Sequence, residues 1–329
     1  MSLLPLTLAI SHYDHVTDLV NGRVPVEGVA LNALSLQIEE IFFRQFTYWD
    51  FDCSEVSMGK YCSLVSQGAA PLVAIPVFPS RVPRHSSFYI RRDGPVKSPA
   101  DLKGKRIGIP EWAQTASVYS RGLIAHRFGV DLTSIQWIQA GVDEPGRLEK
   151  VKLNLPKGID YTSRPDKSLS GMLVSGEIDV ALSAHPPQCF EQGHPNVTRL
   201  FPDYLEAEMK YVKETGIYPI MHAVALKREI VERNPWVAAN LFKAFDEARL
   251  RSVERALNNT SSVLPLPWGY VFAKRMQEIV GEDLMPYGIE KNRATLEAFL
   301  QYAFEQGVCH RKLAPEDLFA ASVQRSFKV

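Results

Sequence analysis

The stretch GIPEWAQTASVYSRG, residues 108–122, decides how the chain is interpreted. It begins inside a short apolar strand, Arg106–Ile109, and its small polar residues then open a helix at Thr115. The first N–H groups of a helix have no partner within the helix, and together with the helix dipole they favour a bound anion. We therefore predict that Thr115 and Ser117 contact an anionic ligand. The alternative is that Thr115 only caps the helix.

Short strands and helices alternate along most of the chain. The predicted strands are Leu6–Ile10, Phe51–Ser57, Pro71–Val77, Arg106–Ile109 and Asp179–Leu182. The predicted helices are Pro99–Leu102, Thr115–Phe128, Ser168–Ser175, a long helix that starts at Asn234–Pro235, and Asn292–Gln306. This alternation is typical of α/β proteins with open, mostly parallel sheets. Ligands of such sheets bind beyond the carboxyl ends of the strands, so the residues that follow each strand are the candidates for a site.

Composition excludes several classes of protein. The 329 residues carry 37 basic and 37 acidic side chains, so the net charge of zero argues against a nucleic-acid or acidic-membrane partner. The first basic residue is Arg23, and Pro5 interrupts the N-terminal apolar run, so we expect no export signal and a cytoplasmic location. The four cysteines are widely spaced and form no CxxC pair, which indicates neither a zinc site nor a redox pair.

Two arginines follow the strand Pro71–Val77 in a loop that two prolines stiffen. Arg81 and Arg84 are three residues apart, and His85 comes directly after Arg84. A guanidinium group suits a carboxylate because its fork donates two parallel hydrogen bonds. We predict that both arginines bind the substrate. The alternative is a basic surface loop without a ligand.

Histidines stand near the predicted strand ends at positions 12, 85, 185 and 222. Histidine titrates near neutral pH and therefore suits proton transfer. We predict His85, His185 and Glu111 as catalytic residues, and His12 and His222 as substrate-binding residues. For any one histidine a structural role is the alternative, and Glu111 could instead form a salt bridge or orient a histidine. The run from His12 to His15 lacks the spacing of a metal motif, so we predict no metal site.

Four segments carry a resemblance to a known fold and family. SPADLKGKRIGIPEWAQTASVYSRGLI (98–124), LVSGEIDVALSA (173–184) and GIYPIMHAVALKREIVERNPWVAANLFKAFDEA (216–248) resemble type II periplasmic-binding-protein folds. FPSRVPRHS (78–86) and residues 108–122 are most similar to the 4,5-dihydroxyphthalate decarboxylases. The resemblance implies two α/β lobes with a ligand in the cleft between them. The first lobe would comprise residues 1–94 and 202–329, and the second residues 95–201.

The resemblance also implies a reaction. A decarboxylase of this family removes one carboxylate of 4,5-dihydroxyphthalate to give protocatechuate and CO₂. The aromatic ring is its own electron sink, so we expect no cofactor, and the partner is a small aromatic dicarboxylate. Two alternatives stay open: a solute-binding protein for an aromatic carboxylate, and a lyase that resembles the chorismate dehydratases. Neither a membrane nor a nucleic-acid partner is expected, and a homo-oligomer is compatible with the sequence.

Overall fold

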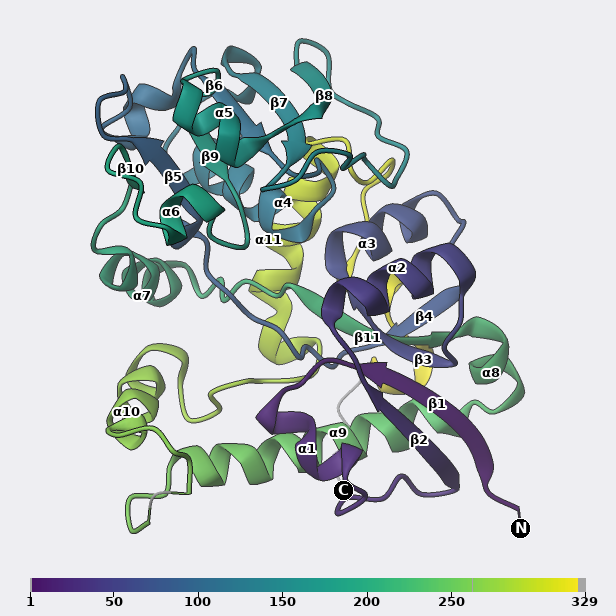
Figure 1. Ribbon diagram of the computed structural model, residues 1–329. Coiled ribbons are helices and arrows are strands. Elements are labelled where there is room, and N and C mark those ends of the chain that lie inside the picture. Colours follow the sequence, from purple (N-terminus) through teal and green to yellow (C-terminus); the bar gives the residue numbers. More distant parts are fainter. Residues whose placement is uncertain (1, 262, 325–329) are drawn as a thin grey trace.

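The computed structural model describes residues 2–261 and 263–324, and it contains two separate β-sheets (Figure 1). The first sheet has the strand order β2 (Val29–Ser35), β1 (Leu4–Ile10), β3 (Cys53–Ser57), β11 (His222–Lys227), β4 (Leu72–Ile75). The second has the order β10 (Val197–Arg199), β5 (Phe88–Arg91), β9 (Val180–Leu182), β6 (Arg106–Ile109), β7 (Gln136–Gly141), β8 (Asp160–Ser168). The first sheet thus combines strands from the N-terminal and the C-terminal parts of the chain, and the segment between these two parts forms the second sheet.

Each sheet is parallel except for one strand. β11 is antiparallel to both β3 and β4 in the first sheet, and β5 is antiparallel to both β9 and β10 in the second. These reversed strands are the ones that the chain enters after it passes from one sheet to the other. The predicted open, mostly parallel α/β architecture is therefore confirmed. We call the first sheet with its helices the first lobe, and the second sheet with its helices the second lobe; the exact boundaries between them stay a prediction.

The helices separate into those that cover a sheet and those that join the lobes. The first lobe has α1 (Asp14–Val20), α2 (Ile38–Tyr48), α3 (Met58–Ser66), α8 (Arg228–Arg233) and α9 (Trp236–Ala256). The second has α4 (Thr115–Gly122), α5 (Leu169–Ser175) and α6 (Gln188–Glu191), and the remaining helices are α7 (Tyr204–Thr215), α10 (Gly269–Val280) and α11 (Arg293–Glu305). In Figure 1, α2 and α3 lie on the side of the first sheet that faces the second lobe, and α11 contacts both α3 and α4.

The cores follow the periodicity of the sequence. On α9, Val237, Leu241, Phe245 and Ala248 recur at helical spacing and are fully buried. The helix predicted to extend from residue 115 to 128 is α-helical only to Gly122, and its last turn, Leu123–Arg127, is a π-helix. No helix of the described residues is long and apolar enough to cross a membrane.

Candidate active site

The two lobes meet where β3 runs into α3 and where β6 runs into α4. The hydroxyl oxygen of Thr115 accepts a hydrogen bond from the Gly59 N–H at 3.0 Å and lies 3.1 Å from the Ser57 hydroxyl. A side chain at Gly59 would place its Cβ 2.2 Å from the carbonyl oxygen of Ala113, so only glycine allows this approach. The N-terminus of α4 is therefore held against the carboxyl end of the first sheet.

Thr115 and Ser117 both lie at this junction. Gln114 is the capping residue, so the alternative that Thr115 caps α4 is wrong; its side chain instead bonds across to the first lobe. The Ser117 hydroxyl donates to the Gln114 side chain at 3.2 Å, and both Thr115 and Ser117 are buried. Their contact with an anion stays a prediction.

Glu111 is completely buried and surrounded by cations. Lys60 Nζ lies 3.1 Å from one carboxylate oxygen, while Arg147 and Lys150 lie 2.8 and 3.9 Å from the other. Burial alone would raise the pKa of Glu111, but the attraction of Lys60, Arg147 and Lys150 outweighs it and the pKa is lowered. A carboxylate held in this way is a poor proton acceptor, so the geometry favours Glu111 as an anchor for cations over the predicted catalytic role.

The two predicted arginines have different surroundings although both are buried. Arg81 donates hydrogen bonds to the carbonyl oxygens of Tyr218, at 3.0 Å, and Pro286, at 2.6 Å, and to the side chain of Asn292. These protein acceptors occupy its guanidinium group. The geometry therefore favours a structural role for Arg81, and its binding of substrate stays a prediction.

Arg84 lacks such acceptors. Its only hydrogen bond from the side chain within the described residues goes to the sulfur of Met221, and no carboxylate of that part of the chain pairs with it. Burial lowers the pKa of Arg84 to about 10, although the more distant carboxylate of Glu208 opposes this change. Met221 directly precedes His222, so the guanidinium group lies beside the first-lobe strand ends. A buried cation without a counterion is suited to an anionic ligand.

His85 lies in an aromatic pocket. The rings of Phe128, Phe201 and Tyr211 pack edge-on against it, with ring-centre distances of 6.2, 5.2 and 5.5 Å. Burial, helped by Arg127, lowers the pKa of His85 to about 4. The imidazole is therefore neutral at pH 7 and is packed like a core residue. This environment favours the structural alternative for His85 over proton transfer.

His222 belongs to a hydrogen-bonded group at the ends of β1 and β3. Its Nδ1 lies 2.6 Å from Oε1 of Glu55, and the Tyr13 hydroxyl donates to the same oxygen at 2.7 Å. The other carboxylate oxygen of Glu55 accepts the Ser11 N–H at 3.1 Å. Glu55 is fully buried, while His222 is only partly buried and its ring packs edge-on against Phe42 at 5.0 Å. This arrangement resembles the carboxylate–histidine pairs that orient a histidine for proton transfer.

His185 makes a contact between the lobes. Its Nε2 lies 3.2 Å from Oε1 of Glu39 on α2, and both side chains are largely exposed at the edge of the junction. The hydrogen bond to Glu39 raises the pKa of His185, while burial and the nearby Arg84 and Arg147 oppose that increase. His185 therefore shares a neighbourhood with the cations around Glu111. His12 is exposed and makes no side-chain hydrogen bond within the described residues.

The structure thus brings six of the predicted residues to the junction of the lobes, namely Arg84, Glu111, Thr115, Ser117, His185 and His222. It does not bring His12, Arg81 or His85 into that group. Sequence reasoning missed Glu55 and Glu39 as site residues. Glu55 has a signal, because it is the one charged residue in the short buried strand Cys53–Ser57. Glu39 has none, because it is one of several charges on an amphipathic helix.

A metal site finds no support in the side chains. Within residues 2–261 and 263–324, no group of three or more histidine, cysteine, aspartate or glutamate side chains is arranged to hold an ion. The four cysteines are buried free thiols. Burial strongly raises the pKa of the Cys62 thiol, which disfavours the thiolate form needed for a metal ligand.

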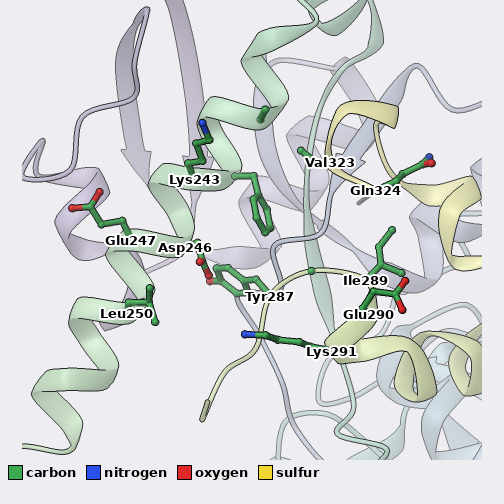
Figure 2. Close-up of a pocket in the computed structure, with 13 residues that line it drawn as sticks. Lys243, Asp246, Glu247, Leu250, Tyr287, Ile289, Glu290, Lys291, Val323 and Gln324 are labelled. Carbon is green, nitrogen blue, oxygen red and sulfur yellow. The ribbon is translucent and has the colours of Figure 1, made fainter. Parts of the chain in front are cut away.

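A separate cavity of about 470 Å³ lies between α9 and the segment that leads into α11 (Figure 2). Figure 2 shows Lys243, Glu247 and Leu250 on α9 opposite Glu290 and Lys291. Its lining carries charges of both signs, and Lys291 is already bonded to Asp283 at 3.0 Å. None of the predicted site residues lines this cavity. The junction of the lobes is therefore the better candidate for a site that binds two carboxylates.

Comparisons with known proteins agree on one family. A 4,5-dihydroxyphthalate decarboxylase from Comamonas testosteroni is 36% identical over 330 residues, and the match covers 100% of both chains. A protein of the same name from Pseudomonas putida is 43% identical over 204 residues, which are 62% of this chain and 79% of the relative. The model of the family described as NMT1/THI5 like matches residues 66–147.

Solved structures of low sequence identity share the fold. The periplasmic aliphatic sulphonate binding protein SsuA from Escherichia coli has a TM-score of 0.53 at 15% identity and covers 98% of this chain and 99% of its own. The desulfurization enzyme DszB has a TM-score of 0.51 at 17% identity, over 95% and 96% of the two chains. The predicted type II periplasmic-binding-protein-like fold is thereby confirmed.

Proposed function

Because the chain belongs to the 4,5-dihydroxyphthalate decarboxylase family, we propose that it is a carboxy-lyase that converts 4,5-dihydroxyphthalate to protocatechuate and CO₂. The observation that carries the proposal is the full-length relationship to the Comamonas testosteroni enzyme at 36% identity. The junction of the lobes supports it, because that site offers cations for two adjacent carboxylates and histidines for proton transfer.

The carboxylates of the substrate would be bound by the cationic side of the site. Arg84 is buried and lacks a carboxylate partner within the described residues, while Arg147 is partly exposed and shares Glu111 with Lys60 and Lys150. Lys60, Arg147 and Lys150 face the carboxylates of Glu111 and the neighbouring Glu149, which leaves one net positive charge at this side of the junction. Electrostatic attraction and bidentate hydrogen bonds from the arginines would then orient a dianionic ring.

The histidines would divide the two proton transfers. His222 would take the proton of the ring hydroxyl that is para to the leaving carboxylate, because Glu55 fixes its ring and stabilises the resulting imidazolium ion. His185 would donate a proton to the ring carbon that bears that carboxylate, because its raised pKa keeps it protonated to higher pH. The pair therefore provides one base and one acid from opposite lobes.

The electron flow balances without an external oxidant or reductant. Loss of the hydroxyl proton sends electron density through the ring, and the ipso carbon forms a C–H bond with the donated proton. The C–C bond to the carboxylate then breaks, CO₂ leaves, and the electron pair of that bond restores the aromatic ring. His222 returns its proton to the phenolate oxygen, and His185 regains a proton from water. The net change is replacement of one carboxylate by hydrogen.

The direct experiment is to incubate the purified protein with 4,5-dihydroxyphthalate and to follow CO₂ and protocatechuate. The assay is run after chelation and again with added divalent metals. Turnover in either condition supports the proposal, and stoichiometric binding without turnover in both overturns it in favour of a solute-binding role. His222→Asn should lower kcat by roughly 10²–10⁴-fold, the usual contribution of a positioned acid or base. His126→Asn, which changes a histidine bonded to Glu305, is the control.

A cytoplasmic location and a homo-oligomer are part of the same proposal. Cell fractionation tests the location. Light scattering combined with size-exclusion chromatography tests the oligomer, since a monomer of this chain has a mass of 36.9 kDa. A peak at that mass over the working concentration range would contradict the oligomer.

A further inference from the structure

Glu55 accepts hydrogen bonds from two side chains at the ends of the first-lobe strands. Tyr13 Oη and His222 Nδ1 lie 2.7 and 2.6 Å from the same carboxylate oxygen, Oε1. A carboxylate has only acceptor atoms when it is ionised, so both neighbours must direct their protons at it. No lysine or arginine within the described residues pairs with Glu55. The direction of these two hydrogen bonds is therefore set by Glu55 alone.

This direction determines what Tyr13 and His222 can offer a ligand. Tyr13 has a single O–H proton and gives it to Glu55, so its oxygen can only accept a further hydrogen bond. The Ser80 hydroxyl supplies one such bond and slightly opposes the strong rise in the pKa of Tyr13 that burial and the charge of Glu55 cause. One lone pair on the oxygen remains. When its only ring proton is on Nδ1, directed at Glu55, His222 likewise offers only the lone pair of Nε2.

The neighbours of this group keep the two acceptors in place. Phe42 packs edge-on against the His222 ring, and Tyr13 stacks on His15 with ring centres 5.2 Å apart. Burial lowers the pKa of His15 to about 4, so it stays neutral at pH 7 and leaves the charge state of Tyr13 undisturbed. Backbone pairing of His222 with Ser57 fixes the position of the histidine relative to β3.

We propose that Tyr13 and His222 form a subsite that recognises two adjacent ring hydroxyls. His222 Nε2 accepts the hydrogen bond of the hydroxyl para to the leaving carboxylate, and Tyr13 Oη accepts that of the neighbouring hydroxyl. Tyr13 is thus a specificity-determining residue, and Glu55 is a positioning residue that makes both partners acceptors. The inference rests on the proposed function and adds where the hydroxyl edge of the substrate binds.

A ligand with one hydroxyl leaves either His222 Nε2 or the remaining lone pair of Tyr13 Oη without a donor. Sites built to hydrogen-bond a hydroxyl reject analogues that lack it, because the polar group of the site is then unpaired. The subsite therefore favours an ortho-dihydroxylated ring over a monohydroxylated one. It also favours neutral hydroxyls over a carboxylate, since a carboxylate in this place would face the two acceptors and the nearby Glu55 carboxylate.

The test measures binding, so it does not depend on turnover. Isothermal titration calorimetry gives Kd for 3,4-dihydroxybenzoate, 3-hydroxybenzoate and 4-hydroxybenzoate with the wild-type protein and with Tyr13→Phe. The readout is the preference, defined as Kd of the tighter monohydroxybenzoate divided by Kd of the dihydroxy compound. We expect a wild-type preference of about tenfold or more and a value lower by about 3–10-fold in Tyr13→Phe, the size of one hydrogen bond. Tyr48→Phe, at an exposed site on α2, is the control and should keep the wild-type preference.

Glu55→Gln gives a second, independent measurement. The amide can accept only at its oxygen and donates from its nitrogen, so it no longer fixes both neighbours as acceptors. We expect the preference to fall and kcat to fall more than KM changes, whereas a merely structural role would lower the melting temperature and leave the preference intact. An unchanged preference in folded Tyr13→Phe overturns the subsite. If the wild-type protein binds with the expected preference but shows no turnover, the proposed function is overturned and the subsite is supported.

Discussion

Arg84→Met is expected to weaken substrate binding and to make the unliganded protein more stable. Arg84 is buried and forms no ion pair within the described residues, so only the more distant Glu208 partly compensates its charge in the unliganded protein. Methionine is shorter than arginine but apolar and flexible, and it would lie next to Met221. Apolar residues that replace buried charges are often neutral or stabilising. Stability and binding should therefore change in opposite directions.

The magnitude follows from the pKa of the side chain. Burial lowers the pKa of Arg84 from 12.5 to about 10. Since a tenfold change in a dissociation constant corresponds to about 1.4 kcal/mol, the charged form is roughly 3 kcal/mol less favourable here than in water. Both the folded and the unfolded protein carry the charge at pH 7, so this penalty is constant below pH 9. Loss of the attraction to Glu208 offsets part of the gain, which leaves about 1–2 kcal/mol of expected stabilisation.

The substrate carboxylate would recover most of that penalty when it pairs with Arg84. A loss of roughly 3 kcal/mol in binding corresponds to an increase in KM of about 100-fold. The free energy of unfolding is measured in urea, and KM is measured in the CO₂ assay or replaced by Kd for a phthalate inhibitor. Stability measured without ligand and affinity measured with it then separate the two effects.

Arg81→Met is the matched control. Arg81 is equally buried and its pKa is likewise lowered to about 10 by burial, but it satisfies two carbonyl oxygens and Asn292. Pro286 keeps the hydrogen bond from the Asn292 amide, but the Tyr218 carbonyl oxygen and the Asn292 side-chain oxygen lose their donor, at a cost of about 1–3 kcal/mol for each buried acceptor left unsatisfied. Arg81→Met should therefore destabilise the protein. The reasoning about Arg84 is refuted if Arg84→Met destabilises the protein as much as Arg81→Met does, or if KM is unchanged.

Two further predictions concern the junction of the lobes. Glu39→Gln replaces the charged acceptor that raises the pKa of His185 by a neutral one, so His185 should lose its proton at lower pH. The alkaline limb of the pH–kcat profile should therefore shift to lower pH, and an unshifted limb would exclude His185 as the acid. Gly59→Ala should lower the free energy of unfolding by about 1–3 kcal/mol and reduce kcat/KM, because its Cβ would overlap the Ala113 carbonyl oxygen. Gly269→Ala is the control and should change kcat/KM little, since its Cβ would have its nearest contact at 3.6 Å. Equal effects of the two variants would contradict the close approach at Gly59.

Periodicity made the fold predictable. The strand at Arg106–Ile109 has the predicted bounds, and the stripe on α9 is buried as predicted. The reversed strands β5 and β11 were not predicted as reversed, because direction within a sheet depends on where the chain crosses between sheets. Neither the periodicity of apolar residues nor the residues in the turns indicate where that crossing occurs. The π-helix at Leu123–Arg127 was missed for a similar reason, since its pattern of apolar residues fits a continuous α-helix.

For the site, the sequence predicted only the types of residue and their approximate place in the fold. The rule that ligands bind beyond strand ends directed attention to His222, Thr115 and Arg84, which do lie at the junction of the lobes. It also selected His85, which follows the same loop but turns into an aromatic pocket. His85 and Arg84 differ in the direction of their side chains, and residues that are distant in sequence but close in space determine that direction.

Arg81 and Arg84 show what a sequence leaves undetermined. They have the same chemistry, lie three residues apart in one loop, and are buried to the same degree with the same lowered pKa. Only the acceptors differ, because Tyr218, Pro286 and Asn292 reach Arg81 from the C-terminal part of the chain. Natural proteins retain destabilising groups where function requires them. We propose that the guanidinium group of Arg84, which has no ion-pair partner within the described residues, is such a group, and that a carboxylate of the substrate pairs with it.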